Sequence, residues 1–146
     1  MIEQMRKQLH RDEGAVIVNG RHAVYDDHLG FATIGYGRLV DRRRGGGLTD
    51  AEAEFLLAND IERVTRDLTI RLPWFSDLDE PRQGALINMA FQLGVNGLLK
   101  FKRTLAHCEA GDWEKAEREA LNSNWAKQTP NRAHRVTQQL RTGDWV

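Results

Sequence analysis

The sequence lacks the features that mark several specialised classes of protein. Among its 146 residues it has one cysteine, Cys108, which excludes a framework of internal disulfides and allows folding in a reducing compartment. No apolar run approaches the roughly 18 residues of a membrane span, and the polar N-terminal segment does not resemble a secretory signal. We therefore expect a protein that accumulates in the cytoplasm and has no stable membrane association.

The sequence also lacks an excess of charge of either sign. Lys and Arg number 21, Asp and Glu number 21, and the formal net charge is zero. A chain whose main task is to bind nucleic acid would be clearly basic, so we expect no nucleic-acid partner. Positive charge is concentrated at residues 42–44, which are three arginines followed by three glycines. We interpret this segment as a flexible basic loop.

The first third of the chain predicts one helix and a small sheet. Apolar residues three and four positions apart predict a helix that stops at Gly14, with Glu13 in its last turn or just past it. β-Branched and aromatic residues then recur from 16 to 36, and Asn19-Gly20 is a strong hairpin signal. With a second turn near 28–30, we expect an antiparallel sheet of two or three strands.

The rest of the chain predicts helices. Thr49 and Glu52 fit a capping box, which opens a long helix that ends before Pro73. Its expected buried stripe is Ala53, Leu57, Ile61, Val64 and Leu68. Further helices are expected from Asp79 to Gly94, from Leu98 to Cys108, from Asp112 to Ala120 and from Pro130 to Gly143.

This order of elements predicts an α+β fold in one domain, 1–146. We expect a β lobe at about 14–47, a linking helix at about 49–70 and a helical lobe at about 74–146 that includes the N-terminal helix 1–12. A sheet this small is not stable alone and must pack against neighbouring elements. We therefore expect an active-site cleft between the two lobes.

Two acidic residues stand where glycoside cleavage could use them. Glu13 lies at a helix C-terminus, where the helix dipole and the adjacent Asp12 both favour the protonated form that a general acid needs. Asp27 lies in or beside a turn, where an ionised carboxylate is favoured. One protonated and one ionised carboxylate across a cleft suit glycoside hydrolysis, although acidic residues at helix ends and turns are common.

Longer motifs indicate a family. In order along nearly the whole chain, they are RDEG (11–14), YDDHLGFATIGYG (25–37), LTDAEAEFLLAND (48–60), INMAFQLG (87–94), NSNWAKQTPNRAHRV (122–136) and RTGDW (141–145). With these motifs the sequence resembles the phage-type lysozymes and endolysins, glycoside hydrolase family 24. The resemblance implies a lysozyme-like fold, no cofactor, and hydrolysis of the β-1,4 bond between N-acetylmuramic acid and N-acetylglucosamine in peptidoglycan.

The resemblance also assigns roles to residues. Glu13 matches the general acid, Asp27 the base that activates water, and Thr33, five residues beyond Asp27, a holder of that water. The interval 14–26 between Glu13 and Asp27 is longer than is usual in the family, which leaves Asp26 as an alternative base. The spacing to Thr33 and the alternation after Tyr25 favour Asp27.

Other matches concern substrate and support. Leu39, Phe91 and Thr104 match positions that line sugar subsites, and Gln92 is a candidate to bond an acetamide. Phe91 could equally be a core residue, since Met89 and Leu93 share its helix. Arg132 matches an arginine that pairs with the catalytic Glu, and Arg38 with Asp60 matches a family ion pair. We interpret His22, Asp26, Asp27 and His28 as solvated surface, not as a metal site.

The expected protein is a monomeric phage endolysin that cuts peptidoglycan strands with inversion and causes host cell lysis. It would stay in the host cytoplasm until a holin permeabilises the membrane, and would then act in the periplasm on the cell wall. The alternatives are a lytic transglycosylase, a non-catalytic peptidoglycan-binding relative and, more remotely, a nucleic-acid-binding module. Intact Glu13, Asp27 and Thr33 favour hydrolysis over these.

Overall fold

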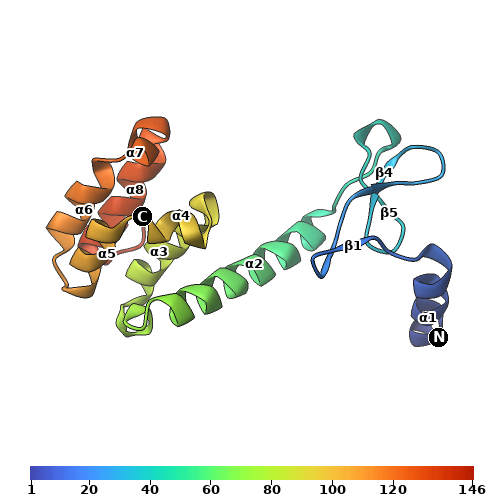
Figure 1. Cartoon of the computed structure of the whole chain (residues 1–146), viewed down its shortest axis with the longest axis horizontal. Helices are drawn as coiled ribbons and strands as arrows, with labels where there is room; N and C mark the ends of the chain where they lie inside the picture. Colours follow the sequence, from blue (N-terminus) through green and yellow to red (C-terminus); the bar gives the residue numbers. More distant parts are fainter. The chain divides into compact units, whose positions relative to one another are not determined.

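The computed structural model describes all residues from Met1 to Val146. They form two compact units, which we call the sheet unit (Met1–Phe55) and the helical unit (Leu56–Val146) (Figure 1). Helix α2 (Asp50–Arg71) begins in the first and continues into the second. The α+β class predicted from the sequence is confirmed. None of the helices has both the length and the apolar character needed to span a membrane.

The sheet unit opens with α1 (Ile2–Glu13), which ends at Gly14 with a φ of 67°. Five short strands follow, and they form two antiparallel sheets, not the single sheet that was predicted. They are β1 (Ile17–Val18) with β2 (Arg21–His22), and β3 (Tyr25–Asp26), β4 (Ala32–Ile34) and β5 (Arg38–Leu39) in that order.

Tight turns explain this division. The predicted Asn19-Gly20 hairpin is confirmed, with φ values of 50° and 75° that suit a type I′ turn. The strand-favouring residues continue to Tyr36, but β4 ends at Ile34. Gly35 and Gly37 have φ values of 64° and 78°, so the chain reverses there and creates β5.

The segment 42–44 is a short 3₁₀ helix, η1 (Arg42–Arg44), so the prediction of a flexible loop is wrong. Asp41 caps it by accepting a 2.8 Å hydrogen bond from the backbone N–H of Arg43. The Arg43 side chain and this backbone bond lower the pKa of Asp41 to about 2. Gly45, with a φ of 75°, ends the element in the left-handed conformation.

The predicted capping box of α2 is confirmed, because Thr49 N–H donates to Glu52 and Glu52 N–H donates to Thr49 Oγ1 at 2.8 and 3.2 Å. The predicted buried stripe is confirmed only at its C-terminal end. Val64 and Leu68 are buried, whereas Ala53, Leu57 and Ile61 are exposed. The core of the helical unit therefore reaches only the last part of this helix.

After α2, the helical unit consists of η2 (Phe75–Asp77), α3 (Glu80–Leu93), α4 (Val95–Leu99), α5 (Lys102–Glu109), α6 (Trp113–Leu121), α7 (Asn124–Gln128) and α8 (Pro130–Thr142). Helix α6 packs against α5 and α8, and α3 packs against α8 (Figure 1). Asp79 caps α3 as predicted, by accepting a hydrogen bond from Arg82 N–H.

Two details of this unit differ from the prediction. The helix expected from Leu98 to Cys108 is two helices, because Phe101 leaves the helical conformation and its ring packs edge-on against Trp125 at 6.0 Å. Helix α7 was not predicted. Ser123 caps it by accepting a hydrogen bond from Ala126 N–H, and the helix buries Trp125.

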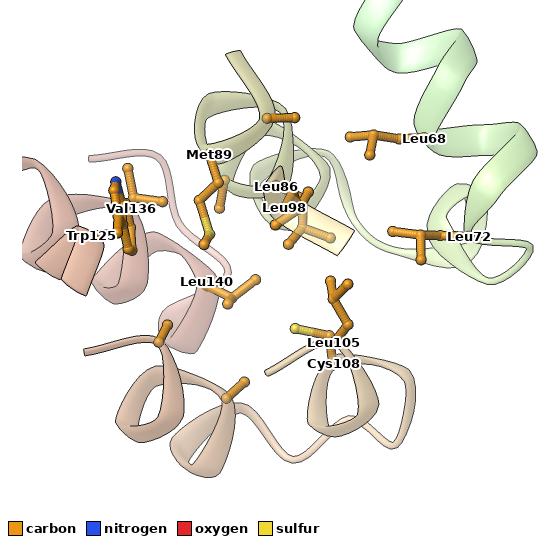
Figure 2. Packing of buried hydrophobic residues seen from close by; sticks show 14 of the residues in the cluster. Leu68, Leu72, Leu86, Met89, Leu98, Leu105, Cys108, Trp125, Val136 and Leu140 are labelled. Atoms are coloured by element: carbon orange, nitrogen blue, oxygen red, sulfur yellow. The ribbon is translucent and has the colours of Figure 1, made fainter. Parts of the chain in front are cut away.

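The hydrophobic core lies in the helical unit (Figure 2). Leu86, Met89 and Leu140 lie near its centre together with Cys108. Burial raises the pKa of the Cys108 thiol to about 12. Cys108 is thus a small core residue. The sheet unit has no buried apolar side chain, and its buried residues are Thr33 and Asp41. Turns and hydrogen bonds, and not a hydrophobic core, therefore stabilise the sheet unit.

The predicted lobe limits, including the placement of 1–12 with the helical lobe, stay predictions.

Candidate active site

The carboxylate of Glu13 stands at the end of α1 against a glycine turn. Glu13 is the last helical residue and is exposed. A methyl group in place of the hydrogen on Gly37 would lie 2.6 Å from Glu13 Oε2 and 2.8 Å from its carboxyl carbon. No group in the sheet unit hydrogen-bonds to this carboxylate. Glycine at 37 therefore leaves the space that the carboxylate occupies.

Aromatic contacts hold the end of α1 in the sheet unit. The ring of His10 on α1 stacks on Tyr36 with centroids 4.0 Å apart and planes 22° apart. His22 of β2 meets the same tyrosine edge-on at 5.0 Å. Tyr36 lies between Gly35 and Gly37, so these contacts fix the turn that faces Glu13. This cluster was not predicted from the sequence, where its only signal is an aromatic residue between two glycines.

Asp27 follows β3 and is oriented by backbone groups. Its Oδ1 accepts hydrogen bonds from Leu29 N–H and Phe31 N–H, both 2.9 Å long. Asp27 N–H donates to Phe31 O, and Gly30 N–H donates to Asp27 O. This confirms the predicted turn near 28–30. The second carboxylate oxygen, Oδ2, has no hydrogen-bond partner in the sheet unit and remains free for a ligand.

Thr33 is linked to Asp27 through one residue, Phe31. Thr33 is only 4 % exposed, and its hydroxyl donates a 2.9 Å hydrogen bond to Phe31 O. Because the hydroxyl hydrogen is used there, Thr33 Oγ1 can serve a ligand only as an acceptor. The same residue, Phe31, therefore orients both the Asp27 carboxylate and the Thr33 hydroxyl.

Strand register bears on the choice between Asp26 and Asp27. Tyr25 pairs with Thr33, and Asp26 pairs with Ala32. Because side chains alternate along a strand, Asp26 lies on the face opposite Thr33, whereas Asp27 continues the face of Tyr25 and Thr33. The register therefore supports Asp27, and its assignment as the base stays a prediction.

The predicted sugar-contacting residues differ in exposure. Leu39 pairs with Thr33 in the register and is half-buried. Phe91 is 44 % exposed, which favours a surface role over the core alternative. Gln92 accepts a 2.8 Å hydrogen bond from Trp125 Nε1, so its carbonyl is already engaged. Thr104 is 2 % exposed on α5. Sugar contacts by these four residues stay predictions, and burial disfavours Thr104 most.

Phe91 lines a hollow in the helical unit together with Leu57, Ile61, Ile87, Asn88, Arg132 and Trp145. Arg132 is held there, because it donates to Asn88 Oδ1 at 2.9 Å and to Asn88 O at 3.2 Å. Its predicted pairing with Glu13 joins residues of different units and stays a prediction.

The predicted ion pair between Arg38 and Asp60 joins residues of different units and stays a prediction. Arg38 pairs with Glu52, at 3.0 Å from Nη1 to Oε2, and lowers the pKa of Glu52 to about 2. Asp60 pairs at 2.8 Å with Arg63, which lies three residues further along the same helix. The capping box holds the Glu52 carboxylate at the start of α2, where it meets Arg38.

The contact at Gly37 gives a first prediction. Gly37→Ala should lower kcat on peptidoglycan by about 10²-fold, because the added methyl group must displace the Glu13 carboxylate. Gly35→Ala is the matched control, since Gly35 also has a positive φ but nothing lies within 4 Å of an added methyl group. Initial rates of both variants measure the effect. Equal losses of kcat in the two variants would mean that backbone strain, and not displacement of Glu13, causes the effect.

The fold and this site define a lysozyme-like α+β protein. The model of the phage lysozyme family matches residues 17–142, a range that includes Asp27 and Thr33 and begins after Glu13. The chain belongs to the phage lysozyme family and is a glycoside hydrolase of the muramidase type.

Relatives from different settings are similar over nearly the whole chain. Probable T4-type lysozyme 1 of Dictyostelium discoideum is 31% identical, over 98% of this chain and 96% of that protein. Probable T4-type lysozyme 2 of the same organism is 28% identical, with the same coverage of both chains. The pre-baseplate central spike protein Gp5 of Enterobacteria phage T4 is 35% identical over 96% of this chain, which spans only 28% of Gp5.

Proposed function

We propose that the chain hydrolyses the β-1,4 bond between N-acetylmuramic acid and N-acetylglucosamine in peptidoglycan strands. Glu13 is the general acid, Asp27 the base and Thr33 the residue that holds the water. The observation that carries the proposal is the link through Phe31, which orients both the Asp27 carboxylate and the Thr33 hydroxyl. No cofactor is needed for this chemistry.

The two oxygens suit the activation of a water molecule. A nucleophilic water must direct a lone pair at the anomeric carbon, so both of its hydrogens have to be bound elsewhere. Thr33 Oγ1 can accept one of them, because its own hydrogen is donated to Phe31 O. Asp27 Oδ2 can accept the other and take the proton as the new bond forms. Glu13 meanwhile gives its proton to the leaving oxygen.

Digestion of purified peptidoglycan tests this function directly. The chain should clear outer-membrane-stripped Gram-negative cells and release fragments with N-acetylmuramic acid at the reducing end, measured by mass analysis. Fragments ending in a 1,6-anhydro sugar would support a lytic transglycosylase instead. Binding without release of any sugar would support the non-catalytic alternative.

The stereochemical outcome gives a second prediction. A water held between Asp27 and the sugar attacks from the face opposite the leaving group, so the β-linked substrate should first yield the α-anomer. Proton NMR spectra recorded within minutes of cleavage, before mutarotation, measure this. An initial β-anomer would mean retention, and Asp27 would then attack the sugar carbon directly.

We further propose that the biological role is that of a phage endolysin in host cell lysis. The protein would act as a monomer, remain in the cytoplasm until a holin permeabilises the membrane, and then reach the wall in the periplasm. Membership of the phage lysozyme family supports this setting. Cells that express the chain with a holin should lyse, whereas cells that express either protein without the other should keep their turbidity. Lysis by the chain alone would contradict the requirement for a holin.

A further inference from the structure

The arginine run 42–44 forms an anchored feature of the sheet unit. Asp41, which is 8 % exposed, receives Arg43 Nη2 at 2.6 Å and Arg43 Nε at 3.0 Å. Asp26 adds a second, electrostatic attraction for Arg43. The charge of Arg43 is therefore largely balanced, and Arg43 ties η1 to the end of β5.

The next residue, Arg44, is held by an aromatic ring and not by a carboxylate, so its positive charge is not balanced by an ion pair. Its guanidinium carbon lies 4.1 Å from the centroid of the Phe31 ring, whereas that of Arg43 is 5.8 Å away. No carboxylate of the sheet unit pairs with Arg44, and its side chain is exposed. Stacking on the ring occupies one face of the guanidinium and leaves its N–H groups at the edge free to donate.

Phe31 connects this cation with the candidate catalytic groups, since its ring contacts Arg44 and its backbone contacts Asp27 and Thr33. The backbone of Phe31 orients Asp27 and Thr33, as described above. Phe31 is two residues before Thr33, and Leu39 is the register partner of Thr33, so all three side chains belong to one face of the sheet. Arg44 therefore extends the face that carries the proposed water-binding oxygens.

We propose that Arg44, supported by Phe31, binds a carboxylate of the peptide stems that peptidoglycan strands carry. The proposal rests on the muramidase function above. Stem carboxylates supply the negative charge of an intact strand, because its sugars are neutral and its lactyl groups are tied up as amides. A planar guanidinium with free edge N–H groups matches a carboxylate through two parallel hydrogen bonds. The chain would thus recognise the stem as well as the glycan.

Two substrates that differ only in charge test the proposal. Purified sacculi are compared with the same sacculi after their carboxylates are converted to amides with carbodiimide and excess ammonia. The unsubstituted chain should lose about fivefold in kcat/KM on the amidated sacculi. Arg44→Gln should show that same loss on untreated sacculi and no further loss on amidated ones. The change should lie in KM, with kcat unchanged.

Two further variants complete the design. Arg44→Lys keeps the charge without the planar fork and should lie between the parent and Arg44→Gln. Arg21→Gln is the matched control, because Arg21 is an exposed arginine of β2 that pairs with no carboxylate, and it should behave as the parent on both substrates.

Each alternative outcome overturns the proposal. An equal loss by Arg44→Gln on both substrates would mean a structural effect, and no loss on either would remove Arg44 from substrate binding. A loss by Arg21→Gln equal to that of Arg44→Gln would mean general attraction to an anionic wall. Activity of the unsubstituted chain on neither substrate would contradict the muramidase function itself, and is thus distinguishable from failure at Arg44 alone.

Discussion

Glu13→Gln should fold like the parent chain and lose about 10²–10⁴-fold in the rate of peptidoglycan cleavage. Glutamine keeps the shape of the side chain at the end of α1 but has no proton to give to the leaving oxygen. No hydrogen bond in the sheet unit depends on the carboxylate, so little stability should be lost. Initial rates of sugar release measure activity, and thermal unfolding followed by circular dichroism measures stability.

Glu3→Gln is the matched control for this experiment. Glu3 lies on the same helix and makes an exposed ion pair with Arg6, and such pairs contribute little to stability. It should retain the parent rate. Near-parental cleavage by Glu13→Gln would remove Glu13 from the role of general acid, whatever the behaviour of the control.

Asp27→Asn should be as damaging as the change at Glu13, again by about 10²–10⁴-fold, because its amide cannot take a proton from water. The backbone decides the orientation of the new side chain. Leu29 N–H and Phe31 N–H both donate to the Oδ1 position, so the carbonyl oxygen must stay there. The NH₂ group is then placed at Oδ2, the position proposed for the base. The turn should persist while the chemistry fails.

Asp26→Asn provides the comparison that separates the two aspartates. Asp26 is exposed and its strand partner is Ala32, so we expect its variant to cleave at nearly the parent rate. The assay is the same measurement of sugar release, at several enzyme concentrations. An inactive Asp26→Asn beside an active Asp27→Asn would shift the base by one residue and place it on the other face of the strand.

Much of the local structure could be predicted because its signals lie within a few residues of one another. The capping box of Thr49 and Glu52, the cap at Asp79 and the hairpin at Asn19-Gly20 all satisfy backbone groups of their immediate neighbours. The candidate pair Glu13 and Asp27 was also accessible, from helix-end and turn positions together with the family motifs.

Local signals were insufficient where packing between distant segments decides the conformation. Phe101 lies within an apolar pattern that predicts one helix, yet its contact with Trp125 accompanies a break between α4 and α5. The ion pair of Arg38 with Glu52 was not predicted either, although the capping box that holds the Glu52 carboxylate was. In both cases the deciding partner lies more than ten residues away.

The sequence by itself determined the family, the α+β class and the identity of the candidate catalytic residues. Only the tertiary structure decided that Gly37 makes room for Glu13, that Phe31 orients both Asp27 and Thr33, and that Arg44 stacks on Phe31. Periodicity and capping signals report hydrogen bonds between near neighbours along the chain. Contacts such as these depend on turns that bring separate strands and helices together, and their geometry exists only once the chain has folded.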